Sequence, residues 1–430
     1  MKPVGSGVEE RPRPVVLTFA AFYLPGYKGG GPIRSVANLA YGLKEEFDFR
    51  IVTSDRDLGD RSPYPGIRVN AWQVVAGVRV FYLSPGPLRW WRIVRLLLVG
   101  DFDLIYLNSF WSRPFSMLPI WLRLLGVARR IPVLLAPRGE FSPGALGIKE
   151  SRKRFYFAFG RFLGIYAGVT WHASTQREAA DIKHVLGSMP RISIAKPFCS
   201  SRVAIASDLL VQSPPSSSGT NPLAPTKVPG SLNVVFVSRI CRMKNLSAAL
   251  EILAGVREDV HFNIYGPIED TAYWAECRRL IKELPPNVRA DYRGELPHTQ
   301  VAGVFRIHQL LFLPTLGENF GHVIGEALMA GCPVLISDQT PWRQLREERV
   351  GWDLPLDQVA LFQQAIQECA AMGAVPFEEF SRRASLFGQR VAGNPDAVVQ
   401  HHSMFLSMVY AIPGNNIKPK PDAPDTEPAV

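Results

Sequence analysis

Short apolar runs alternate with amphipathic runs along most of the chain. The apolar runs are rich in Val, Ile, Leu and Phe, and most are followed by a segment with apolar residues at helical spacing. This alternation is typical of parallel β-sheets that are covered by helices on both faces. We expect strands at residues 14–20, 49–55, 78–84, 103–109, 132–138 and 168–174 in the first half, and at 232–239, 260–266, 310–315 and 333–338 in the second.

The pattern predicts two doubly wound, Rossmann-like α/β domains that face each other across a cleft, because 430 residues are too many for one ordinary domain. We place the N-terminal domain at 14–200, a Pro- and Ser-rich linker at 201–231 and the C-terminal domain at 232–395. Flanking segments are a flexible N-terminus at 1–13, a C-terminal helix at 396–412, for which packing back onto the first domain is one option, and a disordered tail at 413–430.

Composition narrows the class of protein. Hydrophobic residues make up 47% of the chain, which excludes global disorder. The five cysteines are scattered without a Cys-x-x-Cys pair, which suits a reducing compartment and argues against a zinc site. We expect no transmembrane helix, because no uninterrupted apolar run reaches about 18 residues. The start "RPRPVVLTFA" resembles a signal peptide, but the glycine loop and helix pattern that follow favour a buried first strand.

Glycines and cations follow several of the predicted strands, where open α/β sheets bind their ligands. Gly29 to Gly31 lead from the first strand into a helix, so the backbone there can approach an anion closely. The loop matches neither a dinucleotide fingerprint nor a Walker A motif, and a merely flexible loop is the alternative. In "SRICRMKNL", Arg239 and Lys244 flank a strand-to-helix junction, either as a pyrophosphate clamp or as solvated surface charges. Gly266 ends a strand, either beside a ligand or in a plain turn.

The stretch "PTLGENFGHVIGEALMAGCPVLISD" places two carboxylates around a glycine turn. Glu318 lies in the predicted loop, and Glu326 lies in the first turns of the helix that begins near Gly321. Main-chain N–H groups around Phe320 would face an incoming phosphate, aided by the helix macrodipole. Carboxylates accept hydrogen bonds from sugar and ribose hydroxyls, so the layout fits a nucleotide-sugar.

These motifs together resemble the family 4 glycosyltransferases of the GT-B fold. "GENFGHVIGEAL", "SRICRMKNL" and "GGGPIRSVANLAYGL" carry the resemblance, which covers nearly the whole chain apart from the linker and tails. "APRGEFSPGALG" is similar to a subset of the family that builds bacterial surface polysaccharide or lipopolysaccharide. The resemblance implies a hexosyltransferase-type enzyme that retains anomeric configuration, uses a nucleotide-diphosphate sugar and needs no metal or other cofactor.

The resemblance also implies a role for individual residues. Glu326 would bind the ribose hydroxyls, and Gly30 and Gly31 would lie against the donor phosphate. The resemblance implies that Glu318, together with the backbone of Asn319, Phe320 and Gly321, would hold the donor sugar, and that Arg239 and Lys244 would neutralise the pyrophosphate. We take Glu318, Arg239 and Lys244 as the catalytic candidates, and count Gly266 with the donor-binding residues.

The acceptor side is less well defined. Many relatives carry a histidine where "DLIYLNSFW" has Asn108, which can hydrogen-bond a hydroxyl but cannot act as an acid or base. Arg138 and Glu140 end another predicted strand and are further candidates. His172 precedes a Thr-x-x-Glu capping box, Thr175 to Glu178, and either reaches the cleft or packs within the strand.

Positive charge is concentrated in one region. Residues 89–161 hold 13 Lys and Arg against 4 Asp and Glu, and Arg89, Arg92 and Arg95 are three apart in the helix-like run "LRWWRIVRLLLVG". One interpretation is a core helix with one charged edge. The other is contact with the anionic inner face of the plasma membrane by an otherwise cytoplasmic protein, which would bring a lipid-linked acceptor to the cleft. Nucleic acid is not expected as a partner, because no recognised binding motif accompanies the charge.

Two other functions remain compatible with the sequence. A GT-B protein could bind a sugar-nucleotide as a scaffold without turnover, or it could be a sugar-nucleotide epimerase. Product analysis separates these, because only transfer yields free nucleoside diphosphate together with a new glycoside.

Overall fold

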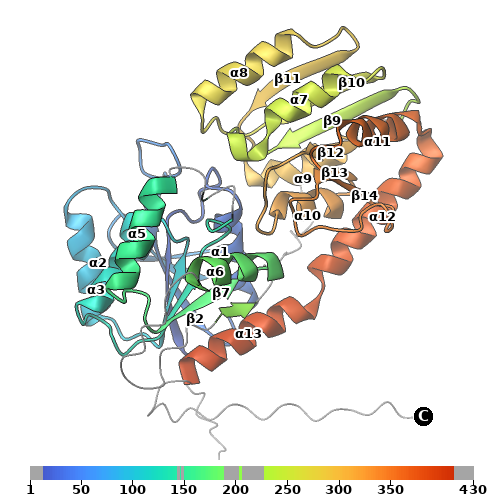
Figure 1. The fold of residues 1–430 in the computed structure, drawn as a ribbon. Helices are drawn as coiled ribbons and strands as arrows, with labels where there is room; N and C mark the ends of the chain where they lie inside the picture. Colours follow the sequence, from blue (N-terminus) through green and yellow to red (C-terminus); the bar gives the residue numbers. More distant parts are fainter. Residues whose placement is uncertain (1–12, 143–145, 147–149, 188–202, 206–226, 411–430) are drawn as a thin grey trace, which may run out of the picture.

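The computed structural model describes residues 13–142, 146, 150–187, 203–205 and 227–410. It contains two sheets, each flanked by helices, which confirms the predicted pair of Rossmann-like α/β domains (Figure 1). The predicted flexible N-terminus, apart from Arg13, and the predicted disordered tail lie outside the described residues.

The N-terminal sheet has eight strands in the order β3-β4-β2-β1-β5-β6-β7-β8. Every neighbouring pair is parallel except β3 with β4 at the edge. The strands are β1 (Val15–Ala20), β2 (Asp48–Ser54), β3 (Trp72–Val75), β4 (Val78–Leu83), β5 (Leu104–Asn108), β6 (Val133–Ala136), β7 (Val169–Ala173) and β8 (Val203–Ile205). The helices are α1 (Gly31–Gly42), α2 (Leu88–Val99), α3 (Leu118–Leu124), α5 (Glu150–Phe162) and α6 (Gln176–Gly187), with a π-helix at Arg113–Met117.

The C-terminal sheet has six parallel strands in the order β11-β10-β9-β12-β13-β14. The strands are β9 (Ser231–Val237), β10 (Asp259–Tyr265), β11 (Val288–Gly294), β12 (Leu310–Leu313), β13 (Val334–Ser337) and β14 (Gly351–Leu354). The helices are α7 (Leu246–Ala254), α8 (Thr271–Lys282), α9 (His298–Arg306), α10 (His322–Met329), α11 (Val359–Ala371) and α12 (Ala374–Ala392), with a 3-10 turn at Arg242–Lys244.

The range predicted as linker needs a correction at both ends. Residues 203–205 form β8, which pairs in parallel with β7 and extends the first sheet beyond residue 200. Ser231 already begins β9, and the Lys227 ammonium is buried, donating to the carbonyls of Val228, Ser231 and Ala370. The Pro and Ser content of the range is typical of a linker, so the sequence did not indicate these short ordered ends. Residues 206–226 lie outside the described part of the chain.

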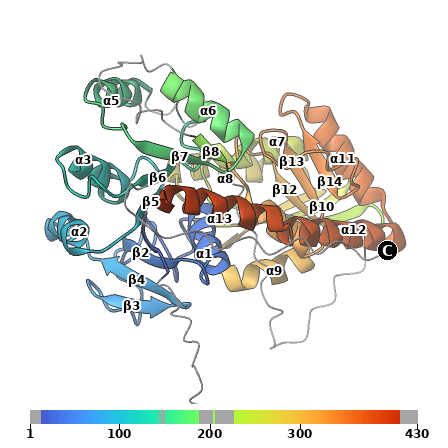
Figure 2. The ribbon, with the colours of Figure 1, turned by 90° about the horizontal axis from the view of Figure 1, so that it is seen from below.

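The last described helix crosses from the second domain to the first. Helix α13 (Pro395–Tyr410) follows α12 and lies along the N-terminal sheet (Figures 1 and 2). Its Met404, Phe405, Met408 and Val409 are buried in the same apolar cluster as the α1 face of that sheet. The N-terminal core is therefore completed by residues from the far end of the described chain.

Helices α2, α3 and α5 cover the opposite face of the N-terminal sheet and lie side by side in both views (Figures 1 and 2). Helix α2 buries Ile93 and Leu97, whereas Trp91 and Leu98 are 65% and 61% exposed. The three arginines do form one flank of α2, and Arg89 and Arg92 turn toward the sheet, where both donate to Ser84. Arg95 is exposed alongside these apolar side chains, and both interpretations of α2 stay predictions. No described helix is long and apolar enough to span a membrane.

Candidate active site

The predicted site segments follow the four strands that flank the two switch points. In each sheet the strand order reverses at the centre, between β1 and β5 and between β9 and β12. The glycine loop follows β1, and Asn108 ends β5. Arg239 follows β9, and Glu318 follows β12. Ligands of open α/β sheets bind at such points, so topology directs these segments toward a common region.

The glycine loop lies against the C-terminal domain. Gly30 has a φ of 70°, a conformation that favours glycine, and forms the N-cap of α1. A Cβ added to Gly30 would lie 3.8 Å from Nε of Arg239, and one added to Gly31 would lie 3.6 Å from Cδ2 of His322. The start of α1 and the loop after β9 thus approach each other closely enough to contact one small anion together.

Three polar contacts hold the two domains together around this loop. The Tyr27 hydroxyl donates to Glu295 at 3.1 Å, and the Lys28 ammonium lies 3.1 Å from the same carboxylate. The pKa of Lys28 is raised, chiefly by its hydrogen bond to Asp60, with Glu295 adding to the effect against burial. On the other side of the loop, Ser35 Oγ and His322 Nε2 are 2.9 Å apart. The backbone of the loop is therefore positioned by both domains.

Each predicted pyrophosphate cation has a carboxylate partner. Lys244 Nζ lies 2.5 Å from Glu318 Oε1, and both side chains are almost 90% buried, at 12% and 11% exposed. Arg239 Nη1 lies 2.5 Å from Glu269 Oε2 in a more open position. The pairing fixes where the cations point. It also places the predicted sugar-binding carboxylate in contact with one of the predicted clamp residues.

The loops that carry Lys244 and Glu318 are joined by hydrogen bonds from side chains to backbone carbonyls. Asn245 adopts a left-handed conformation as the N-cap of α7, and its amide donates to the carbonyl of Pro314 at 2.9 Å. The Thr315 hydroxyl donates to the carbonyl of Met243 at 3.0 Å. The charged pair is thus built on two strand ends that are locked to each other rather than on free loops.

Glu326 is held between two basic side chains from different domains. His298, at the start of α9, lies 3.2 Å from its carboxylate, and Nε of Arg34, in α1, lies 3.9 Å away. Burial alone would raise the pKa of Glu326, but the hydrogen bond to His298 and the charges of His298, Arg34 and His322 outweigh it, and the pKa is lowered. The carboxylate is therefore kept ionised and ready to accept hydrogen bonds.

Sequence reasoning missed His298, Arg34 and His322. Arg34 stands within the quoted stretch "GGGPIRSVANL", where a cation one turn into the helix after the glycines was the available signal. His298 lies 28 residues before Glu326 along the chain and on another helix, so no local pattern connects them.

The turn at Asn319 to Gly321 reaches the N-terminal domain. Gly321 has a φ of 80° and caps α10, as the motif predicted. The amide of Asn319 donates to Ser174 Oγ at 3.2 Å, and a Cβ added to Gly139 would lie 3.2 Å from Cβ of Asn319. The carbonyl of Phe320 accepts from the Trp342 indole at 2.6 Å. The turn therefore faces the loop after β6, between the two domains.

Asn108 and Arg138 are brought together. Arg138, with a φ of 57°, donates from Nε to Asn108 Oδ1 at 2.6 Å, from Nη1 to Ser174 at 2.9 Å and from Nη2 to the Tyr106 hydroxyl at 2.7 Å. Asn108 is only 2% exposed. The pair forms a buried polar layer at the strand ends, which positions Ser174 for its contact with Asn319.

Three other predicted site residues are used structurally. Glu140 accepts from the Ser109 hydroxyl and from the backbone N–H groups of Phe110 and Trp111, at 2.8, 2.5 and 3.0 Å. Burial raises its pKa, and these hydrogen bonds offset part of the rise. Glu140 therefore shapes the loop after β5, and its expected place on the acceptor side stays a prediction.

For His172 and Gly266 the contacts fit the structural alternative that the sequence left open. His172 is fully buried, with Nδ1 3.0 Å from the Tyr106 hydroxyl and its ring against His401 of α13, so it packs within the strand. Its capping box is formed in part, since the N–H of Glu178 bonds to Thr175 Oγ1. A Cβ added to Gly266, whose φ is 139°, would meet the carbonyl of Ser238 at 1.9 Å. Neighbouring backbone, not space for a ligand, therefore requires this glycine.

A metal-binding cluster is not among the features of the described chain. No group of three or more His, Cys, Asp and Glu side chains within the described residues is arranged to hold a metal ion.

Two family sequence models match the chain, one in each domain. The model described as "Glycosyl transferase 4-like domain" matches residues 30–193, and the one described as "Glycosyl transferases group 1" matches residues 224–368. The chain belongs to the group 1, family 4 glycosyltransferases. The resemblance to family 4 glycosyltransferases is thereby confirmed. No curated protein sequence matches the chain.

Solved structures show the same fold at low sequence identity. Sucrose-phosphate synthase from Thermosynechococcus elongatus is 16% identical with a TM-score of 0.64, covering 93% of this chain and 100% of its own. HepE from Anabaena, in complex with UDP and glucose, is 14% identical with a TM-score of 0.61 and the same coverage. A UDP-forming trehalose-phosphate synthase from Burkholderia vietnamiensis is 13% identical with a TM-score of 0.61, covering 93% and 99%. The fold of this glycosyltransferase is GT-B.

Proposed function

We propose that this glycosyltransferase moves a hexosyl group from a nucleotide-diphosphate sugar to a glycan or lipid-linked acceptor with retention of anomeric configuration and without a metal. The pathway proposed for it is the synthesis of a bacterial surface polysaccharide or lipopolysaccharide. The observation that carries the proposal is the approach of Gly30 to Arg239 and of Gly31 to His322 across the two domains, with the Lys244–Glu318 pair in the loops after β9 and β12.

The arrangement supports distinct roles for its parts. Glu326, kept ionised by His298 and Arg34, accepts the ribose hydroxyls. Arg239, Lys244 and the N–H groups at the start of α1 bind the diphosphate and stabilise the negative charge that develops on it. Glu318 and the Asn319 to Gly321 turn hold the sugar. Three structures of HepE from Anabaena support the donor class, since they contain UDP-glucose, UDP, or UDP with glucose.

The proposed transfer step needs no side chain to act as a base. The acceptor hydroxyl forms a bond to the anomeric carbon on the face from which the diphosphate leaves. The bond between that carbon and the diphosphate oxygen breaks, and the leaving phosphate takes the hydroxyl proton. The protein then contributes mainly by positioning and by charge stabilisation.

The first experiment identifies the donor. A panel of nucleotide-sugars is screened for thermal stabilisation, where a ligand at about 100 times its Kd adds about 2.7 kcal/mol to the free energy of unfolding. The stabilising donor is then incubated with candidate acceptors in excess EDTA. We expect free nucleoside diphosphate, a new glycoside and an unchanged anomeric configuration by NMR. Strict dependence on manganese or magnesium, an inverted product, or epimerised donor without a glycoside would contradict the proposal.

We also propose that the N-terminal domain rests on the anionic inner face of the plasma membrane. Three neighbouring helices support this. Their exposed apolar side chains are Leu88, Trp90, Trp91, Leu98 and Val99 of α2, Leu124 of α3, Leu125 just after it, and Phe155, Phe159 and Phe162 of α5. Aromatic residues at an interface, flanked by arginines, are typical of helices that lie on a membrane. Such contact would deliver a lipid-linked acceptor to the same domain that contributes the acceptor side of the cleft.

A further inference from the structure

A cavity of about 360 Å³ lies outside the cleft, between α2 and the β2, β3 and β4 edge of the N-terminal sheet. Its volume is within the range of small-molecule sites. Four polar side chains line it, and they are Arg50, Asn70, Arg92 and Arg95. No Asp or Glu is among the described residues that line it. Three guanidinium groups without a lining carboxylate favour an anionic ligand.

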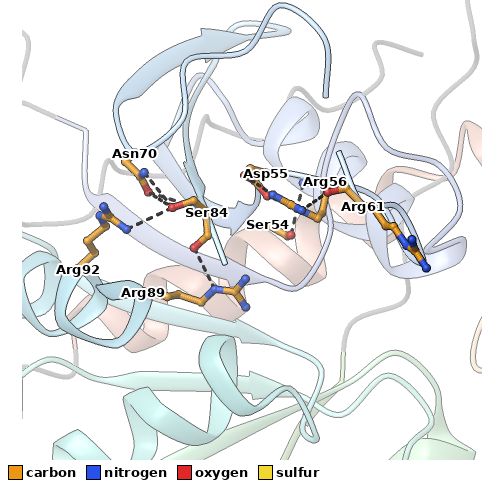
Figure 3. A network of polar contacts seen from close by, with 8 residues as sticks. All are labelled: Ser54, Asp55, Arg56, Arg61, Asn70, Ser84, Arg89 and Arg92. Atoms are coloured by element: carbon orange, nitrogen blue, oxygen red, sulfur yellow. Dashed lines mark hydrogen bonds and ion pairs between the residues drawn. The ribbon is translucent and has the colours of Figure 1, made fainter. Parts of the chain in front are cut away.

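Arg92 is held in place before any ligand arrives. Its Nη1 donates to Ser84 Oγ at 3.2 Å, and the amide of Asn70 donates to the same hydroxyl at 3.0 Å (Figure 3). Arg89 donates to the carbonyl of Ser84 from one turn earlier in α2. These contacts use one nitrogen of the Arg92 guanidinium and leave its remaining donors for a ligand.

The other two arginines leave net positive charge at the cavity. Within the described chain, Arg95 has neither a hydrogen-bond nor an ion-pair partner, and it is exposed. Arg50 pairs with Asp48 at 3.1 Å, but the same carboxylate oxygen also binds Arg79 at 2.6 Å. The Asp48 carboxylate is therefore shared by Arg50 and Arg79. Arg92 and Arg95 have no carboxylate partner.

The remaining walls are apolar and continue to the surface. Trp72, Phe81, Leu96, Val99 and Phe102 line the cavity, and Trp72 and Phe81 pack edge to face at 5.3 Å. Val99 is 77% exposed, and its neighbour Leu98 belongs to the outward apolar face of α2. An apolar path therefore leads from the arginines toward the surface proposed to meet a membrane. A ligand that consists only of an anionic group would leave these apolar walls in contact with water.

From this geometry we infer that the cavity is a binding site for the phosphate headgroup of an anionic amphiphile, with the first part of its chain against Leu96 and Val99. The site is separate from the cleft and uses none of its residues. Its failure would leave the proposed glycosyl transfer untouched. The same phosphate chemistry is offered by a lipid and by a free phosphate ester, and the apolar walls select the lipid.

Soluble probes test the inference on the full chain by isothermal titration. Dihexanoyl phosphatidic acid, below its micelle concentration, carries both phosphate and chains, glycerol 3-phosphate carries the headgroup alone, and dihexanoyl phosphatidylcholine carries chains with a zwitterionic headgroup. We expect phosphatidic acid to bind one site, about ten-fold or more tighter than either other probe. Equal affinity for glycerol 3-phosphate would overturn the lipid assignment, and absence of phosphatidic acid binding would overturn the site.

Variants locate the site. R92Q/R95Q keeps side chains of similar length and should weaken phosphatidic acid binding about ten-fold or more. Arg95→Gln alone removes no hydrogen bond or ion pair within the described chain, so it guards against misfolding of the double variant, and it should cause a smaller loss of the same kind. R129Q/R130Q removes two exposed charges from the same domain, away from the cavity, and should change little. Equal losses in the control pair and the cavity pair would mean general charge attraction and would overturn the inference. Transfer to a soluble acceptor should be unchanged in all three.

Discussion

The two domains share a strand arrangement but differ in what their outer helices show to solvent. In the N-terminal domain, α2 and α5 expose Trp and Phe side chains, among them Trp91 at 65% and Phe162 at 80%. In the described residues from 227 onward, the exposed large apolar side chains are Leu and Val alone, namely Val228, Leu316, Val359, Val375, Leu386, Val398 and Val399. Aromatic surface on one domain only indicates that this domain has a further partner.

The two domains also differ in the partners of their Arg and Lys side chains. In the C-terminal domain, Arg239 and Lys244 each pair with an acid that lies in or near the cleft. In the N-terminal domain, Arg138 is tied into a buried layer, whereas Arg92 and Arg95 are left facing a cavity without acids. Under the proposed function, donor chemistry belongs to the second domain and membrane attachment to the first. Variants of each domain should therefore fail in different assays.

The largest effect is expected from reversing charge on α2. Changing Arg89, Arg92 and Arg95 together to Glu should abolish co-sedimentation with vesicles containing anionic lipid, because each arginine contributes about 1 kcal/mol near such a surface. The loss should exceed about 100-fold in partition coefficient. Donor affinity should be unchanged, and wild-type binding should release at high salt. If the wild-type protein ignores anionic vesicles at low salt and uses a soluble acceptor efficiently, the attachment role is wrong.

Next in size is the loss of a clamp cation. Arg239→Ala and Lys244→Ala should each weaken nucleotide-sugar binding by about 1.5–3 kcal/mol, the range for hydrogen bonds to charged groups. Vesicle binding should change little in both variants, and Tm should change little in Arg239→Ala but fall in Lys244→Ala. Lys244→Ala is the more severe of the two, because it also leaves the Glu318 carboxylate almost buried without its partner. Wild-type donor affinity in both variants, measured by titration, would exclude the clamp.

The two glutamates should divide binding from turnover. Glu326→Ala should mainly raise the Kd for the nucleotide, about ten-fold, while Glu318→Ala should mainly lower kcat. The reason is position, since Glu326 lies between His298 and Arg34, and Glu318 lies beside the cation that would meet the leaving group. Nucleotide Kd and single-turnover rates check the division. Equal loss of nucleotide affinity in both variants would contradict it.

The smallest effect is a shift in pH dependence. The lowered pKa of Glu326 means that its charged form persists as pH falls through the ordinary glutamate range, so nucleotide binding should persist there too. His298→Ala removes the main opposing contribution to burial, and the acid limb of nucleotide binding should move to higher pH. Titrations across acidic pH in wild type and H298A measure this. An unshifted limb would show that Glu326 is not the titrating group.

Local patterns predicted the strands and the turns at their ends, but not the pairs that join distant segments. "GENFG" predicted that a helix begins near Gly321, because glycine readily adopts the positive φ that the turn requires. The contact of His298 with Glu326 joins two helices, and it depends on how the strands are ordered. Glu140 looked like an acceptor residue because charged groups at strand ends often face ligands. Three donors in the loop after β5 use its oxygens instead.

Helix α13 reverses the usual relation between the order of synthesis and the order of folding. Domains generally fold as they emerge from the ribosome, beginning with the N-terminal one. Here the core around Phe47, Phe49 and Tyr106 lacks Phe405 until the described chain is almost finished. The second domain can bury its own core earlier, and the first domain closes last. An N-terminal fragment cut before α13 would therefore expose an apolar sheet face, and aggregation during translation would be the expected fate of truncated chains.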